Sequence, residues 1–211
     1  MKKLSLLLAG FLLMGTASAQ NNSSSELDDL IKVGIQAGIP VSDAKDISSA
    51  ALGINISYQH LINTNVGIGF ATGYTNYFGD DTTKTETGLA GLTSQTIKTK
   101  NDDFGIIPIA ALFRYYPDNT GFYFGADAGY GLLINGGKGS IETTDTSPIG
   151  TTTTEKDFDN SEKLDAGGFY LRPEIGYHNN DWNFFGYYQN TFMSDNSISS
   201  LGLGLSYNIP L

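Results

Sequence analysis

The sequence contains no cysteine, and its 211 residues include only two histidines, His60 and His178. The absence of thiols excludes disulfides, cysteine nucleophiles and thiolate metal sites. Basic residues are scarce as well: 12 Lys and Arg stand against 22 Asp and Glu, which gives a formal net charge of −10. Binding to nucleic acid requires a basic surface, so we expect no nucleic-acid partner.

Long apolar runs are also missing after the N-terminal region. The longest, Ile106–Phe113, has eight residues, whereas a membrane-spanning helix needs about 20. A chain without such a helix can still be integral to a membrane if its strands close into a barrel, because closure pairs every backbone polar group. A membrane location would therefore depend on strands.

The first twenty residues have the pattern of a cleavable export signal. Lys2 and Lys3 precede an apolar stretch over residues 4–15, and an Ala-Ser-Ala sequence ends at Ala19. About twelve apolar residues are too few to span a bilayer, and no cysteine follows the cleavage site to carry a lipid anchor. We therefore expect an exported, unanchored protein.

These features divide the chain into three parts. We expect residues 1–19 to be removed as a signal peptide, residues 20–30 to form a flexible periplasmic segment, and residues 31–211 to fold as one domain. Removal of the signal leaves 10 basic against 22 acidic side chains, a net charge of −12.

From Ile31 onward, apolar residues alternate with small or polar ones. The C-terminal stretch shows this most clearly, because an apolar residue occupies every second position: Leu201, Leu203, Leu205, Tyr207, Ile209 and Leu211. A period of two places the two rows on opposite faces of a strand. A soluble sandwich would bury the apolar row in a core, whereas a membrane barrel turns it toward lipid and fills the lumen with the small and polar row.

Eight segments carry this alternation, at residues 31–39, 52–59, 66–74, 107–116, 122–132, 169–178, 182–192 and 201–211. The seventh is ambiguous because both of its faces carry aromatic residues. For this segment we expect Trp182, Phe184 and Tyr188 to face outward.

The connections between the segments alternate in length. Residues 60–65, 117–121 and 179–181 are short turns at one end, whereas residues 75–103 and 135–165 are long connections at the other. Short periplasmic turns and long extracellular loops are typical of outer-membrane barrels, as are aromatic residues near both ends of the strands. We therefore predict an all-β, eight-stranded antiparallel transmembrane up-and-down β-barrel in the outer membrane, with both termini periplasmic. The alternative is a soluble periplasmic sandwich or lipocalin-like barrel.

One pair of segments carries a family resemblance. Residues 107–116 (IPIAALFRYY), followed by a short turn and residues 122–131 (FYFGADAGYG), resemble the central hairpin of the porin-like outer-membrane β-barrel domain family. That family is common in Bacteroidetes-type envelopes and is similar in architecture to the eight-stranded barrels of the outer-membrane protein A type. The resemblance implies fold and location far more than function. One departure is the C-terminal residue, Leu211, where such barrels often end in Phe or Tyr.

Five charged residues fall on the inward row of the predicted strands: Lys32, Arg114, Asp127, Arg172 and Glu174. The interior of an eight-stranded barrel is only wide enough for side chains to fill it, and an isolated buried ion costs several kcal/mol. We therefore predict that these residues form a charge network that plugs the lumen. The alternative is a path for protons or ions.

Catalytic and metal sites are not indicated. By resemblance, barrel enzymes that modify lipid A use His or Ser groups at the outer leaflet, but His60 and His178 both fall at the predicted periplasmic ends. The stretch Asp157-Phe158-Asp159-Asn160 lacks the Gly and the final Glu of a calcium loop. We expect no enzyme activity, no catalytic residue, no metal and no cofactor.

The predicted function is therefore that of an envelope protein with a filled lumen. We expect strands to continue beyond the membrane within the loops at 75–103 and 135–165 as a protruding hairpin, whose exposed edge could bind an extracellular ligand or a host surface. Expected partners are outer-membrane lipid, lipopolysaccharide and the barrel-assembly machinery, with the protein itself a monomer. Alternative functions are a small-solute porin and a lipid A-modifying enzyme.

Overall fold

The computed structural model describes residues 29–88, 92–118, 120–160, 166–179, 181–194 and 196–211. The expected signal peptide, residues 1–19, lies outside the described residues, as does nearly all of the expected segment 20–30. In the part that is described, no helix has the length and apolar character of a membrane span.

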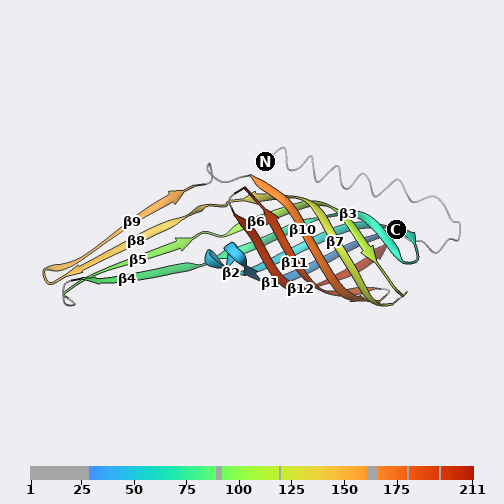
Figure 1. Cartoon of the computed structure of the whole chain (residues 1–211), viewed down its shortest axis with the longest axis horizontal. Helices are drawn as coiled ribbons and strands as arrows, with labels where there is room; N and C mark the ends of the chain where they lie inside the picture. The colour runs from blue at the N-terminus through green and yellow to red at the C-terminus, as the bar shows by residue number, and fades with distance from the viewer. Residues whose placement is uncertain (1–28, 89–91, 119, 161–165, 180, 195) are drawn as a thin grey trace.

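Eight strands close into a barrel (Figure 1). They are β1 (Leu30–Val41), β2 (Ser48–Asn63), β3 (Val66–Gly79), β6 (Phe104–Tyr115), β7 (Gly121–Ile134), β10 (Gly167–His178), β11 (Trp182–Phe192) and β12 (Ser197–Pro210). Each strand pairs antiparallel with its neighbours, and β1 pairs with both β2 and β12, so no barrel strand has a free edge. The predicted eight-stranded antiparallel barrel is confirmed.

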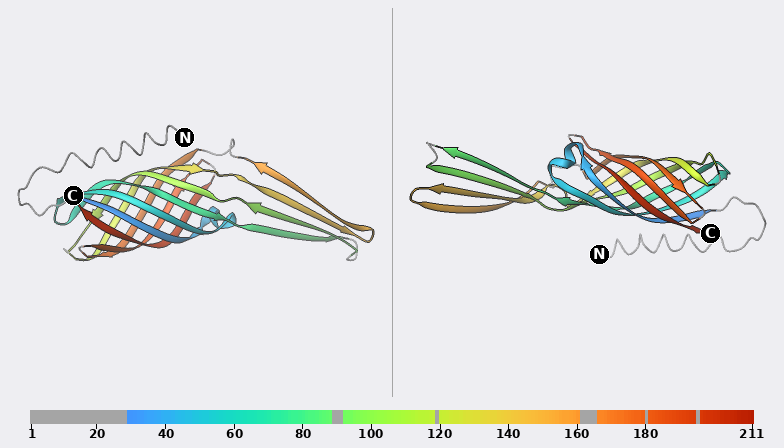
Figure 2. Two further views of the ribbon diagram at one scale, coloured as in Figure 1. Left: turned by 180° about the vertical axis from the view of Figure 1, so that it is seen from behind. Right: turned by 90° about the horizontal axis from the view of Figure 1, so that it is seen from below.

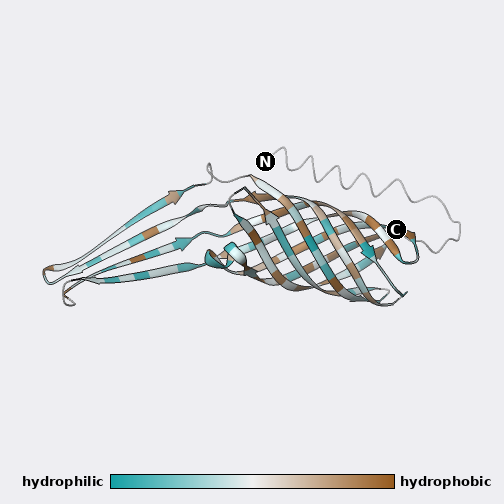
Figure 3. Ribbon diagram, viewed as in Figure 1, coloured by the Kyte–Doolittle hydropathy of each residue, from teal (hydrophilic) through white to brown (hydrophobic). Residues whose placement is uncertain are grey.

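The period-two pattern sorts the side chains between the two faces of the barrel. Outward residues are apolar and accessible: Ile35, Phe70 and Leu203 are 62%, 70% and 73% exposed. Figure 3 shows apolar residues spread over the barrel strands. An exterior of this kind is stable against lipid chains rather than water, because exposure of so much apolar surface to water is unfavourable.

The seventh barrel strand, β11, has the predicted orientation. Trp182, Phe184 and Tyr188 are 41%, 56% and 36% exposed, whereas Phe185 and Tyr187 are buried in the lumen. Aromatic residues on both faces made this strand ambiguous in the sequence. The structure shows that one set lines the exterior and the other fills the interior.

The two long connections are folded rather than irregular. They form β4 (Asp81–Gly88), β5 (Thr93–Asn101), β8 (Lys138–Ser147) and β9 (Gly150–Asp159). The predicted protruding hairpin is therefore two hairpins, and pairing between β5 and β8 joins them into one sheet of order β4-β5-β8-β9. We call this four-stranded sheet the blade.

The blade continues four neighbouring barrel strands, because β4, β5, β8 and β9 follow or precede β3, β6, β7 and β10 in the chain and keep their order. It projects from one end of the barrel, opposite the C-terminus (Figure 2). The strands β8 and β9 have ten residues each, and a strand of this length spans about 33 Å. We refer to the two ends of the barrel as the blade end and the turn end.

Short turns close the opposite end. The Asn63 side-chain oxygen accepts hydrogen bonds from the backbone N–H groups of Asn65 and Val66, at 2.8 and 2.9 Å. Asn179 does the same for Asp181 and Trp182, at 2.9 and 2.7 Å. Asn favours such turns because its side chain satisfies the backbone donors two and three residues further on.

The depth of β12 in the bilayer leads to a prediction. Leu203 lies in the middle of β12 and Ile209 near its end, both in the outward row. We expect Leu203→Arg to lower the free energy of unfolding by about 2–4 kcal/mol, and Ile209→Arg by about 0–1 kcal/mol, because the cost of a lipid-facing charge falls toward the interface. Urea unfolding of the protein in lipid vesicles measures both. Equal losses at the two positions would contradict this placement of β12.

Candidate functional site

Four charged side chains meet inside the barrel because of the register of three adjacent strands. Arg114 lies on β6, Asp127 on β7, and Arg172 and Glu174 on β10. Asp127 stands directly opposite Arg172, and Gly125 separates Arg114 from Glu174 in the next inward row. A Cβ atom at Gly125 would collide with the Arg114 side chain. The glycine therefore leaves the space through which Arg114 reaches Glu174.

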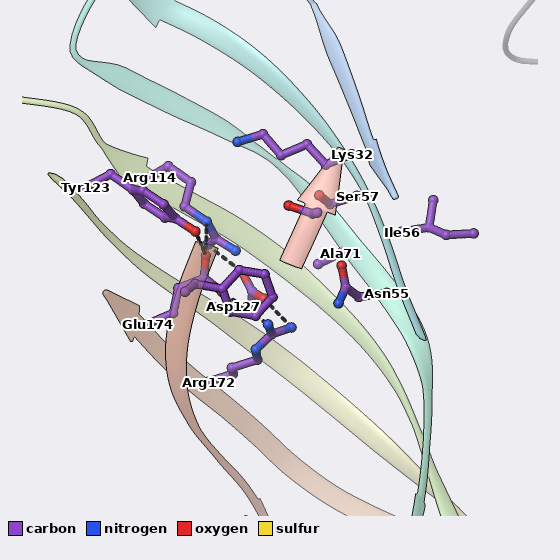
Figure 4. A pocket seen from close by; sticks show the side chains of 12 residues that line it. Lys32, Asn55, Ile56, Ser57, Ala71, Arg114, Tyr123, Asp127, Arg172 and Glu174 are labelled. Carbon is purple, nitrogen blue, oxygen red and sulfur yellow. Dashed lines mark hydrogen bonds and ion pairs between the residues drawn. The ribbon is translucent and has the colours of Figure 1, made fainter. Parts of the chain in front are cut away.

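The four residues form a closed ring in which each cation contacts both anions (Figure 4). Arg114 Nη1 is 2.6 Å from Asp127 Oδ1, and Arg114 Nε is 2.8 Å from Glu174 Oε1. Arg172 Nη1 is 3.8 Å from Asp127 Oδ2, and Arg172 Nη2 is 3.2 Å from Glu174 Oε2. We call these four residues the ion ring.

Neighbouring groups complete the environment of the ion ring. The Tyr123 hydroxyl donates to Glu174 Oε1 at 3.0 Å. The guanidinium carbon of Arg172 lies 5.1 and 4.9 Å from the ring centroids of Phe185 and Tyr187, a cation–π arrangement. Burial of ions is offset only when each is paired and hydrogen-bonded. The formal charges of the ion ring sum to zero, so it meets that condition.

Lys32, the fifth residue of the predicted network, lies beside the ion ring and not in it. Its Nζ donates to the Tyr116 hydroxyl at 2.7 Å and lies 5.3 and 5.9 Å from the ring centroids of Tyr116 and Tyr123. No carboxylate in the described part of the chain lies within ion-pair distance of it. The structure thus brings four of the five predicted residues together and holds Lys32 on tyrosine rings.

A second, uncharged network was not predicted from the sequence. Gln36 Nε2 donates to Thr75 Oγ1 at 2.9 Å and to Gln189 Oε1 at 3.3 Å. Gln189 Nε2 in turn donates to the Tyr77 hydroxyl at 2.9 Å. These side chains come from β1, β3 and β11, and all are buried. The sequence did indicate polar side chains on the inward row of these strands. Because the side chains carry no charge, they were not identified as a network.

Apolar and aromatic clusters occupy both ends of the lumen. Toward the turn end lie Tyr116, Tyr123 and Phe185, with Leu61 packed against this cluster, and Tyr187 extends the cluster to the middle of the lumen. At the blade end lie Ala44, Ala51, Tyr77, Phe104, Ile106 and Ile198, with Leu133 and Met193 against them.

A short 3-10 helix, η1 (Ser42–Asp46), supplies Ala44 to the blade-end cluster. Asp43 fixes this helix across the mouth of the barrel: Asp43 Oδ2 accepts from the Ser197 backbone N–H at 2.9 Å and from its hydroxyl at 3.3 Å. The first connection on the blade side therefore folds over the lumen.

A small cavity remains beside the ion ring. Its volume is about 20 Å³, and its lining includes Lys32, Asn55, Ser57 and Ser206 together with the ion ring (Figure 4). This volume suffices for about one water molecule. Among the described residues, side chains thus occupy the lumen at both ends and in its middle.

The two histidines lie at the turn end. His178 is buried in the lumen, with its ring 4.6 Å from that of Tyr116. His60 is exposed, and its Nδ1 lies 2.6 Å from Asp29 Oδ1. The hydrogen bond with His60 lowers the pKa of Asp29. In the described ranges no three His, Asp or Glu side chains are grouped as metal ligands.

Ion pairs tie together the base of the blade. Lys98 Nζ is 2.8 Å from Asp81 Oδ2, and Lys100 Nζ is 3.1 and 3.3 Å from Glu142 Oε2 and Glu155 Oε1. Hydrogen bonds to Glu142 and Glu155 raise the pKa of Lys100, and the hydrogen bond from Lys100 lowers the pKa of Glu155. These pairs cross three strand boundaries of the blade and so hold its strands in register.

The outer half of the blade carries hydroxyl groups instead. One cross-strand row consists of four threonines, Thr85, Thr96, Thr144 and Thr153, one from each strand. The hydroxyls of Thr85 and Thr96, and those of Thr144 and Thr153, lie 3.2 Å apart. Every residue of β4 is exposed, as is nearly every residue of β9. The blade is therefore a single layer with solvent-accessible outer strands.

The ion ring leads to a second prediction. We expect Arg172→Met to lower the free energy of unfolding by about 3–5 kcal/mol, because it leaves two buried carboxylates with one arginine. Arg172→Met combined with Glu174→Gln restores charge balance around Arg114 and Asp127, so the double variant should be more stable than the single one. Urea unfolding followed by the fluorescence of Trp182 measures both. A double variant no more stable than the single one would show that charge balance does not stabilise the lumen.

The filled lumen leads to a third prediction. In planar bilayers the wild-type protein should show no stable conductance on the nanosiemens scale, because both ends and the middle of the barrel are occupied. Removal of two aromatic side chains of the lumen in a Tyr123→Ala, Tyr187→Ala variant should produce brief openings. Steady large conductance from the wild type would show instead that the barrel is a pore.

No family model matches the chain, and no curated relative matches its sequence. Among solved structures, it is similar to small outer-membrane barrels. The attachment invasion locus protein Ail of Yersinia pestis is 13% identical, with a TM-score of 0.48 over 88% of this chain and 100% of that one. The N-terminal β-barrel domain of Pseudomonas aeruginosa OprF is 9% identical (TM-score 0.44; 87% and 100%), and Neisserial surface protein A is 13% identical (TM-score 0.39; 86% and 97%).

This similarity concerns the fold alone. The construction of the chain itself supports its location, since a closed antiparallel barrel with an apolar exterior and a polar interior is typical of outer-membrane proteins. The expected location in the outer membrane is confirmed, and the protein is an outer-membrane β-barrel.

Proposed function

We propose that this protein is a plugged membrane anchor that presents the blade outside the cell as a recognition surface. The observation that carries the proposal is the continuity of four barrel strands with the four strands of the blade. Hairpins on flexible loops would bind with a large loss of conformational entropy, whereas a sheet that is already ordered avoids much of this cost.

The orientation is part of the proposal. The blade lies outside the cell, and the turn end, where β1 begins and β12 ends, faces the periplasm. The asymmetry of the connections supports this orientation, because outer-membrane barrels carry their short turns on the periplasmic side. The export signal expected at residues 1–19 agrees with it. The apolar row that ends at Leu211 would serve recognition by the barrel-assembly machinery.

The barrel has a supporting role in this proposal and no enzymatic one. Both histidines lie at the turn end, away from the blade, and the ion ring is enclosed by aromatic side chains. A small-solute porin, the alternative function, has no comparable structural support because the lumen is filled. Outer-membrane lipid and lipopolysaccharide would surround the apolar exterior. The affiliation with porin-like barrels of the Bacteroidetes type belongs to the same proposal.

The absence of cysteine provides a direct test of orientation. We expect Thr152→Cys in the blade to react with a membrane-impermeant maleimide on intact cells, and Thr64→Cys at the turn end to react only after lysis. Binding is then compared between cells that carry the full chain and cells that carry a variant without the blade. In this variant, short Gly-Ser linkers replace residues 82–99 and 140–157. Both are tested on immobilised glycans, lipopolysaccharide and matrix proteins, and on vesicles that contain the protein itself.

The expected result is that the variant without a blade folds and is exported but loses the binding seen with the full chain. Heat-modifiable migration in unboiled gels, which is typical of closed barrels, serves as the folding control. Equal binding by both proteins, or binding by neither, would overturn the proposed role of the blade. Labelling of Thr64→Cys on intact cells would overturn the orientation.

A further inference from the structure

The outermost strand of the blade, β9, has an edge suited to pairing with another strand. Among the described residues, β9 has β8 as its only neighbour in the blade. Its pairing with β8 runs one-to-one through all ten residues without a bulge, so the pairing is regular. Alternate backbone groups on its other side therefore point away from the sheet, as in any edge strand.

The outer half of β9 lacks the features that usually protect an edge. Gly150, Thr151, Thr152, Thr153 and Thr154 include no charge and no proline, although charged residues, prolines and bulges commonly prevent edge pairing. Threonine favours the extended conformation. The opposite edge, β4, differs because Lys84 and Glu86 lie within its outer half. The two edges of the blade are thus unequal, and β9 is the unprotected one.

We propose that the β9 edge pairs antiparallel with the β9 edge of a second copy of this chain in an opposing membrane. This inference rests on the proposed outward orientation of the blade and deepens its recognition role. The occupant is a second copy because the sequence of the edge is compatible with itself. In an antiparallel pair of identical strands, a twofold axis perpendicular to the sheet relates the two copies, and the same face of each blade lies on the same side. One residue of β9 must therefore stand directly opposite the same residue of the second copy.

Charge excludes some residues from that position but does not choose among the threonines, since centres at Thr152, Thr153 and Thr154 all avoid opposing like charges. A centre at Glu155 would oppose two carboxylates, and like charges directly opposite are destabilising. A centre at Thr153 instead opposes Thr153 with Thr153, Thr152 with Thr154, and Thr151 with Glu155, so no like charges meet. It also extends the threonine pairing that the blade already uses between Thr144 and Thr153, whose hydroxyls lie 3.2 Å apart.

The direction of the blades determines in which membrane the second copy lies. Each blade extends four neighbouring strands of its own barrel. Blades that share one membrane therefore project from it in the same direction, so their β9 edges would run parallel and could not form the antiparallel pair. In opposing membranes the barrels lie at opposite ends of the joined sheet, and their blades run antiparallel as the proposal requires.

The experiment uses the full chain in two populations of vesicles carrying different fluorescent lipids. Thr153→Cys should form a disulfide between copies from the two populations, because opposed side chains have Cβ atoms about 4.5–5.5 Å apart, which is close to disulfide geometry. Thr85→Cys is the matched control, since Thr85 lies in the same cross-strand row at the opposite edge of the blade. It should give little cross-linking.

A second pair of variants tests tethering without cysteine. We expect Thr153→Lys to slow aggregation of mixed vesicles on the order of tenfold, because it opposes like charges at many linked sites. Thr85→Lys should leave aggregation unchanged. Thr85→Cys cross-linking as efficient as that of Thr153→Cys, or aggregation insensitive to Thr153→Lys, would overturn the proposal. Vesicles that fail to aggregate while the blade still binds another immobilised surface would overturn it too, but would leave the recognition role of the blade intact.

Discussion

The narrow interior of an eight-stranded barrel is the constraint on which the rest of this structure depends. Closure satisfies the backbone in lipid, but it leaves room only for side chains. Once Arg114 and Arg172 point inward, carboxylates must accompany them, and Asp127 and Glu174 do so from adjacent strands. The aromatic cluster of the lumen packs beside these ions, and the cavity next to them has room for about one water molecule. The buried charges are thereby paired mainly with one another.

With the lumen filled, the function that we propose depends on the end of the barrel that carries the blade. The strands β3, β6, β7 and β10 are neighbours in the barrel, and their extensions are neighbours in the blade. In the part of the chain that the structure describes, the blade has no second layer to pack against, so the burial of apolar side chains contributes little to it. Backbone pairing, the ion pairs around Lys98 and Lys100, and attachment to the barrel hold it in place. An isolated sheet of such polar strands would be marginal in water.

The alternation of apolar with small or polar residues was sufficient to predict the parts of the structure that repeat every two residues. The number of barrel strands, the inward position of the charged residues and the outward orientation of Trp182 and Phe184 all follow from this alternation. The pairing of β5 with β8 was missed because their residues are polar on both faces, and register is weakly specified where neither face is buried. The separation of Lys32 from the ion ring was missed for another reason. Alternation gives the face of a residue but not the contacts that its side chain reaches across the lumen.

The same lack of a buried face supports the recognition role that we propose for the blade. A two-layered sheet would hide one face and require a core, whereas a single layer leaves both faces and both edges accessible. Exposed edges are a hazard in soluble proteins because they aggregate. In a barrel fixed in a membrane the antiparallel form of this pairing is limited, since blades that share one membrane project from it in the same direction. Under the orientation that we propose, the barrel that anchors the blade therefore also restricts which partners can pair antiparallel with its β9 edge.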